Sequence, residues 1–558
     1  MPRLLPSLWC FFILLSQLDF NSASEDDLLV VTSSGPIKGK RVPTGSGTVT
    51  AYLGIPYAEP PLGNLRFKKP VPHQPWSDVL EATSFGNACQ QKISFGSPFS
   101  DMWIAKTALS EDCLFLNLWV PHPQPSTPVP VLVWIHGGSF LAGAASLDLY
   151  NGALLAATEN IIVASMNYRL GVLGFLYLPP AAPGNMGLWD QHLAMKWVKE
   201  NAAIFGGDPA RLTLLGQSAG AASVGFHLLS PASQPLFAHA VLQSGAPNAP
   251  WAWKHPKDAL WSAWTLSFLL NCSQQNDSAV VRCLQEKESE NEIFSFFSSH
   301  FSPTTDGAFL PDEPQKLLLN ELPDAKPLLS GVTGDDGSVY VLSIVSDATK
   351  DGGFLSWRHL REGVSSMRKA LEEDIAEAIA LKYSEGGDGP ERYRWALAQF
   401  ARDYFFVCPL VDLAAQMVAA GSPVYIYSFN HHISGSIWDE WMGAAHGSEV
   451  PFLFGTLTSV LGANQSSPEG DAALSRRTMR YWAEFARSGN PTGSRHDVVQ
   501  WPLYNATERH FFPISAVGPQ ATQASLAQHC DFLAKQTSAC KSESRAKVHE
   551  RVSKIRKT

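Results

Sequence analysis

The sequence predicts an α/β fold with a mostly parallel central sheet and helices on both of its faces. Apolar, β-branched runs of strand length recur along the chain, and each gives way to a glycine-rich or polar turn and a helical pattern. Uninterrupted apolar strands are typical of a sheet that is buried on both faces. The expected strands are 129–135, 161–166, 212–215, 327–332 and 424–429, and the expected helices include 188–202, 219–229 and 474–487.

The composition is that of a globular protein with a large core. Of the 558 residues, 45% are hydrophobic and 17% are charged, which excludes a disordered or fibrous chain. The net charge of −9 gives no reason to expect nucleic acid as a partner.

The chain is predicted to have three parts. Residues 1–23 read as a secretory signal peptide, because Arg3 precedes an apolar run that ends in small residues. The alternative, a membrane anchor, needs about 20 apolar residues and is disfavoured by the polar Ser16 and Gln17. We expect one α/β domain over 24–535, no membrane span, and a basic tail over 536–558. The localisation expected for such a chain is secreted.

Cysteines and glycosylation motifs fit export. Without Cys10 of the signal, seven cysteines remain, so pairing in an oxidising compartment leaves one over. Sequence proximity suggests that Cys89 pairs with Cys113 and Cys272 with Cys283, and that Cys408 and Cys530 form a long closure, although sequence alone leaves other pairings open. Cys540 in the tail would then be free or would form a homodimer. The candidate N-glycosylation sites are Asn271, Asn276, Asn464 and Asn505.

The strongest catalytic motif is Gly216-Gln217-Ser218-Ala219-Gly220. It follows an expected strand and opens an expected helix, and a tight strand–serine–helix turn needs small residues on both sides. This context predicts an α/β-hydrolase fold with Ser218 as the nucleophile. An idle serine in a glycine-rich turn is the alternative.

A serine nucleophile also needs donors for the developing oxyanion. His136-Gly137-Gly138-Ser139 follows the 129–135 strand, where this fold places half of its oxyanion hole. We expect the backbone amides of Gly138, Ser139 and Ala219 to converge there.

The acid and the base should follow the nucleophile in that order. Asp336, in Asp335-Asp336-Gly337, follows the 327–332 strand, and His446 lies in a loop of small residues. A turn-forming aspartate and a surface histidine are the alternatives. Chemistry of this kind needs no metal ion and no cofactor, and we expect neither.

From about residue 28 to 535 the chain resembles the cholinesterase and carboxylesterase group, the type-B esterases. The stretches that carry the resemblance are Y-L-G-I-P-Y-A at 52–58, S-E-D-C-L at 110–114, G-N-M-G-L at 184–188 and F-G-G-D-P at 205–209. Met102-Trp103, N-A-P-W at 248–251 and W-M-G at 441–443 are more similar to the cholinesterases within that group.

The resemblance implies roles for individual residues. Ser218, Asp336 and His446 match the catalytic triad, and Gly138, Ser139 and Ala219 match the oxyanion hole. Trp103 matches the indole that holds a quaternary ammonium by cation–π attraction; an ordinary core aromatic is the alternative. Trp251, Phe297 and Ser299 fall near the acyl pocket. The three disulfides proposed above also match those of the group.

Four departures from the group bear on the substrate. Gln217 stands where cholinesterases have glutamate, and a carboxylate about 5 Å from a cation could contribute about 3 kcal/mol at an effective dielectric of 20. No acid matches the aspartate at the gorge mouth, Ser139 stands where glycine is usual, and Asp336 replaces the usual glutamate.

Two functions follow from these observations. The first is ester hydrolysis through an acyl-serine intermediate, with small-molecule carboxylic esters as substrates and choline esters as one candidate. The second is a cholinesterase-like adhesion or binding protein with little or no catalysis. Retention of the serine and the histidine favours the enzyme.

Overall fold

The computed structural model describes residues 28–92, 102–272, 276–288, 293, 301–320, 325–344, 354–367, 373–433, 435–436, 438–461, 469–494, 499–518 and 525–536. The predicted signal peptide and residues 537–558 of the predicted basic tail, which include Cys540, lie outside these ranges, as do Phe297, Ser299 and Asn464. None of the helices within the described ranges combines the length and the hydropathy that a bilayer crossing requires.

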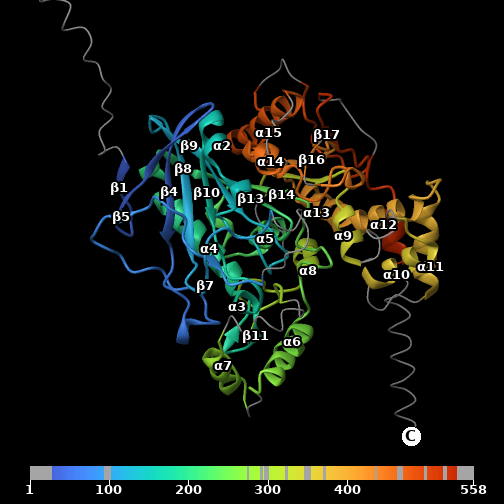
Figure 1. The fold of residues 1–558 in the computed structure, drawn as a ribbon, viewed down its shortest axis with the longest axis horizontal. Helices are drawn as coiled ribbons and strands as arrows, with labels where there is room; N and C mark the ends of the chain where they lie inside the picture. Colours follow the sequence, from blue (N-terminus) through green and yellow to red (C-terminus); the bar gives the residue numbers. More distant parts are fainter. Residues whose placement is uncertain are drawn as a thin grey trace, which may run out of the picture.

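A large mixed sheet of ten strands runs through the centre of the molecule (Figure 1). Seven neighbouring strands, from one edge to β10, are parallel, and the last three are antiparallel. In spatial order the strands are β17 (Phe512–Ile514), β16 (Val424–Phe429), β15 (Leu328–Thr333), β14 (His239–Gln243), β13 (Gly207–Gln217), β9 (Val129–Ile135), β10 (Ile162–Met166), β8 (Phe115–His122), β4 (Gly47–Pro56) and β3 (Lys40–Thr44).

The predicted strands are all present in this sheet. The strand expected at 212–215 is longer, because Gly207 already pairs with Val129 before an irregularity that ends at Leu212. Residues 208–211 are polar or partly exposed, so the apolar pattern reveals only the buried end of β13. This is the end that leads to Ser218.

Both faces of the sheet are buried, as the apolar strands predict. Within β9, Val131, Val133 and Ile135 belong to one apolar cluster, and Leu132 and Trp134 belong to another on the opposite face. Different helices pack into the two clusters. The first cluster takes α4 (Met186–Asn201) and α5 (Ala219–Leu229), and the second takes α2 (Ala153–Glu159), α14 (Val450–Phe454) and α15 (Glu469–Ser488).

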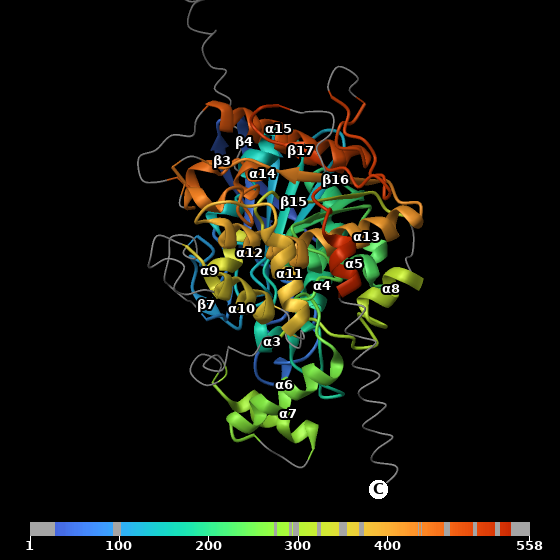
Figure 2. The same ribbon diagram turned by 90° about the vertical axis from the view of Figure 1, so that its right-hand side faces the viewer.

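A further group of helices follows β15 and has its own apolar cluster (Figure 2). Leu360, Val364, Leu397 and Phe400 are fully buried among these helices. The group consists of α9 (Ser338–Ile344), α10 (Trp357–Met367), α11 (Glu373–Ser384) and α12 (Arg392–Arg402).

The structure contains the three disulfides that the sequence suggests. Cys89 is bonded to Cys113, Cys272 to Cys283, and Cys408 to Cys530. The last pair joins the start of α13 (Cys408–Ala419) to a segment 122 residues further along the chain.

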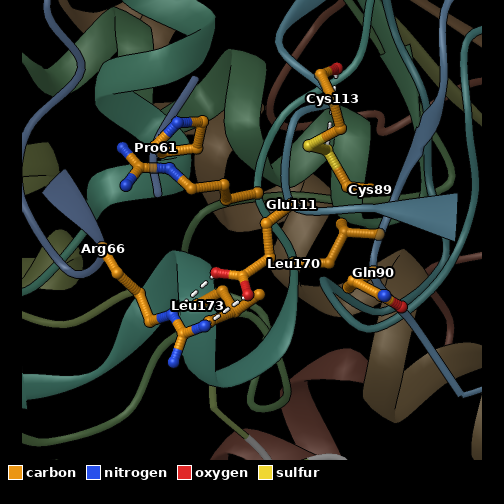
Figure 3. Close-up of a pocket in the computed structure, with 9 residues that line it drawn as sticks. Pro61, Arg66, Cys89, Gln90, Glu111, Cys113, Leu170 and Leu173 are labelled. Carbon is orange, nitrogen blue, oxygen red and sulfur yellow. Dashed lines mark hydrogen bonds and ion pairs between the residues drawn. A yellow bond between two sulfur atoms is a disulfide. The ribbon is translucent and has the colours of Figure 1, made fainter. Parts of the chain in front are cut away.

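A buried ion pair lies beside the first disulfide (Figure 3). Arg66 donates through Nε and Nη2 to the two carboxylate oxygens of Glu111, at 2.7 and 2.5 Å. Its Nη1 donates to three carbonyl oxygens at the end of α7 (Asp277–Glu286), those of Leu284, Gln285 and Lys287. Glu111 of the S-E-D-C-L stretch thus orients an arginine that ties together distant parts of the chain.

We predict that Glu111→Ala lowers the thermal unfolding midpoint strongly. Removing one partner of a buried pair leaves the other charge uncompensated and costs about 3–5 kcal/mol. Glu200→Ala is the matched control, because Glu200 pairs with Lys196 on the surface of α4, where both side chains are about half exposed. Such surface pairs contribute about 0–1 kcal/mol. Equal midpoints for the two variants, measured by circular dichroism, would contradict the prediction.

Candidate active site

Ser218 sits in a strained turn between β13 and α5. Its backbone has φ 57° and ψ −123°, a conformation that a non-glycine residue rarely adopts, and its amide donates to Gln243 O at 2.9 Å. The flanking glycines are required by close packing: a Cβ at Gly216 would lie 2.5 Å from Gly220 O, and one at Gly220 would lie 2.0 Å from Ile135 O. The turn therefore has the geometry that the sequence motif predicts.

His446 and Asp336 come together although they are 110 residues apart. The Nδ1 atom of His446 lies 2.7 Å from Asp336 Oδ1. The other carboxylate oxygen accepts hydrogen bonds from Ser244 Oγ at 2.8 Å and Thr333 N at 3.0 Å. Asp336 is fully buried, and its three donors hold it in one orientation toward the imidazole.

Asp335 fixes the loop that carries His446, a role that the sequence analysis missed. Its Oδ2 accepts from Ala444 N at 2.9 Å, and its own amide donates to Ala444 O at 3.1 Å. A Cβ at Gly443 would lie 2.1 Å from Asp335 Oδ2, so glycine is required there. Burial raises the pKa of Asp335. The only signal in the sequence is the pair of adjacent aspartates after β15.

The loop after β9 reaches Ser218. A Cβ at Gly137 would lie 3.1 Å from Ser218 Cβ. Gly138 has φ +110°, and Ser139 has φ 56° and is exposed. Within the described part of the chain, the amides of Gly138, Ser139 and Ala219 donate to no protein group. These amides are therefore free to bind an acceptor from outside the protein.

Aromatic side chains surround the imidazole. The Phe406 ring is 4.8 Å from that of His446, and the Tyr340 ring is 6.5 Å away. Trp251 lies 6.2 Å from Phe406 and donates its indole N–H to Phe405 O at 3.1 Å. Trp251 therefore contributes to the aromatic wall. The sequence analysis missed Tyr340, Phe405 and Phe406, which resemble ordinary core residues in sequence.

Trp103 and Gln217 border the histidine loop. A Cβ at Gly447 would lie 2.9 Å from the indole of Trp103 and 3.5 Å from Gln217 Nε2. The Gln217 Nε2 atom is 3.1 Å from His446 Nε2. The other two residues expected near the substrate, Phe297 and Ser299, lie outside the described residues.

A buried network lies behind the site. Gln243 donates to Glu449 Oε1 at 3.0 Å, and its own amide oxygen accepts from the indole of Trp482 at 3.1 Å. Burial, together with the negative charge of Asp336, raises the pKa of Glu449 to about 7. The carboxyl group is thus protonated in the folded protein at a pH where it would ionise in the unfolded chain.

We predict that Glu449→Gln stabilises the protein at pH 8 and has little effect at pH 5. The pKa of Glu449 is higher in the folded protein than in the unfolded chain. The free energy of unfolding of wild type therefore falls as pH rises from the unfolded pKa to the folded pKa, and it levels off above about pH 7. The neutral amide avoids this loss of about 3 kcal/mol at most. Unfolding midpoints at both pH values test this, and a gain no larger at pH 8 than at pH 5 would contradict it.

The fold and this site define a class. A mostly parallel α/β sheet carries a serine at a strand–helix turn, followed along the chain by an aspartate in the turn after β15 and a histidine in a loop after β16. That order and placement are those of serine hydrolases with the α/β-hydrolase fold.

Comparisons with known proteins give the family. A model of the carboxylesterase family matches residues 26–533. A cholinesterase from Mus musculus is 41% identical over 540 residues, which cover 93% of this chain and 89% of that protein. An acetylcholinesterase from Bungarus fasciatus is 42% identical over 525 residues, which cover 91% of this chain and 86% of that protein. The chain belongs to the carboxylesterase family and is a carboxylic-ester hydrolase.

Proposed function

We propose that this protein hydrolyses carboxylic esters through an acyl-serine intermediate, with Ser218 as nucleophile, His446 as general base and Asp336 as its orienting acid. The observation that carries the proposal is the buried Asp336 carboxylate bonded to His446 Nδ1 beside the strained Ser218 turn. The N-terminal sequence and the three disulfides support export to an oxidising compartment.

The proposed mechanism has two halves. In acylation, His446 Nε2 takes the Ser218 proton, the oxygen attacks the ester carbonyl, and the imidazolium then protonates the departing alcohol. In deacylation, His446 activates water against the acyl-serine. Asp336 keeps the proton on Nδ1 and stabilises the imidazolium, and the amides of Gly138, Ser139 and Ala219 receive the oxyanion.

We expect Trp103 and Gln217 to face the alcohol group of the ester. These two residues favour esters of uncharged alcohols, or little selectivity between alcohols, over strict specificity for choline. Trp103 offers a π face that would suit a quaternary ammonium. However, the neighbouring Gln217 is neutral and directs an N–H donor into this region, which gives a cation no electrostatic gain. We therefore propose carboxylic esters in general as substrates, with choline esters as a subset.

A catalytically weak binding protein is the second candidate. The contact of Gln217 with His446 Nε2 favours it, because that nitrogen has to accept the serine proton. The assembled acid–base pair and the serine turn favour the enzyme.

Ser218→Ala tests the mechanism. The variant should lose at least 10³-fold in kcat on a short-chain p-nitrophenyl ester, because residual rates arise only from binding and the oxyanion hole. Retained folding is checked by the unfolding midpoint. Hydrolysis by wild type no faster than by the variant would overturn the proposed function.

Gln217→Glu tests the charge argument. A carboxylate about 5 Å from a cation should raise kcat/KM for acetylcholine relative to 3,3-dimethylbutyl acetate by about 10- to 100-fold. The second ester is the uncharged carbon isostere, so any general effect of the substitution on His446 cancels in the ratio. An unchanged ratio would show that position 217 does not face the alcohol group.

A further inference from the structure

The hydrogen bond between Gln217 and His446 can form in only one sense. His446 Nδ1 faces the acceptor Asp336, so Nδ1 carries the proton and Nε2 of the neutral imidazole can only accept. The amide nitrogen of Gln217 can only donate. At 3.1 Å, Gln217 Nε2 therefore donates to the lone pair of His446 Nε2.

This lone pair is the one that the reaction needs. A general base must lie within hydrogen-bond reach of the proton that it removes. In the structure, within the described residues, Ser218 Oγ makes no hydrogen bond with His446, and Gln217 occupies the acceptor instead. The two donors compete for a single site on the imidazole.

The chain holds Gln217 firmly in this position. Gln217 is the last residue of β13, and its backbone pairs with Gln243 of β14. The residue is only 2% exposed. Its amide oxygen lies close to the loop after β9, since a Cβ at Gly137 would be 3.0 Å from it. The amide oxygen thus faces Gly137 and the amide nitrogen faces His446.

We propose that Gln217 is a positioning residue that acts through His446 as a brake: it sequesters Nε2, and the base accepts the serine proton only in molecules where this hydrogen bond is broken. This inference rests on the proposed function of Ser218 and His446 and adds a limit on their rate. The reactive fraction is set by the net strength of one hydrogen bond. Removing the donor should therefore accelerate the attack of Ser218 by about 2- to 10-fold.

Gln217→Met is the direct test, because methionine has a similar length and shape and carries no donor. The readout is the second-order rate of Ser218 labelling by a small uncharged alkyl fluorophosphonate, which requires the serine and its base but no ester turnover. We expect labelling about 2- to 10-fold faster than in wild type, with kcat/KM for p-nitrophenyl acetate rising by a similar factor. A residue with a merely structural role would not accelerate the reaction when replaced.

Two further variants guard the result. Gln217→Asn shortens the side chain by one methylene and withdraws the amide from His446, so it should also accelerate labelling. It replaces the methionine variant as the test if that variant folds poorly. Gln315→Met is the matched control. Gln315 is exposed and donates its amide to Asp412, not to His446, and its replacement should leave the labelling rate unchanged.

The outcomes separate the two proposals. If wild type is labelled and hydrolyses esters, but neither Gln217 variant is faster, the brake is overturned and the esterase function stands. If wild type labels slowly and the Gln217 variants label quickly, the brake is supported whatever the ester turnover of wild type. If no protein is labelled faster than Ser218→Ala, both proposals are overturned.

Discussion

Helix α5 approaches strand β9 so closely that a single added carbon at Gly220 would meet Ile135 O at 2.0 Å. This contact places the amino end of α5 against the loop that leaves β9. The close approach of Gly137 to Ser218 has the same origin, because the backbones of β9, α5 and the loop after β9 pack directly against one another. A strained serine conformation is maintained here because the strands and helices around it are buried on every side.

The acid and the base depend on a second backbone contact. Asp335 bonds both to the amide and to the carbonyl of Ala444, so the two loops are joined one residue before Asp336 and two residues before His446. The loop before His446 requires small side chains because it touches the loop that carries Asp336: a Cβ at Gly443 would overlap Asp335 Oδ2. Asp336 and His446 are therefore positioned by their neighbours in sequence as well as by their own hydrogen bonds.

The strands, the serine turn and the loop after β9 could be predicted because their causes are local. Apolar runs mark buried strands, and glycines on both sides of Ser218 mark a tight turn. The choice of His446 needed the family resemblance, since spacing along the chain does not bring a histidine to a serine. The roles of Asp335 and Phe406 and the partner of Gln217 depend on contacts between residues far apart in the sequence. Asp335 and Ala444 are 109 residues apart, and Gln217 and His446 are 229 apart. Local pattern contains no information about such contacts.

The three residues of the proposed triad lie in the turn after β13, in the turn after β15 and in a loop after β16, in the order in which the chain is synthesised. A nascent chain that has passed Ser218 already has the nucleophile and the glycines around it, but it has no base until residue 446 has been added. The edge strand β17 and Cys530, which closes the disulfide with Cys408, follow later still. A chain that ends before residue 446 therefore contains the proposed nucleophile without its proposed base, and one that ends before residue 512 lacks the edge strand of the sheet.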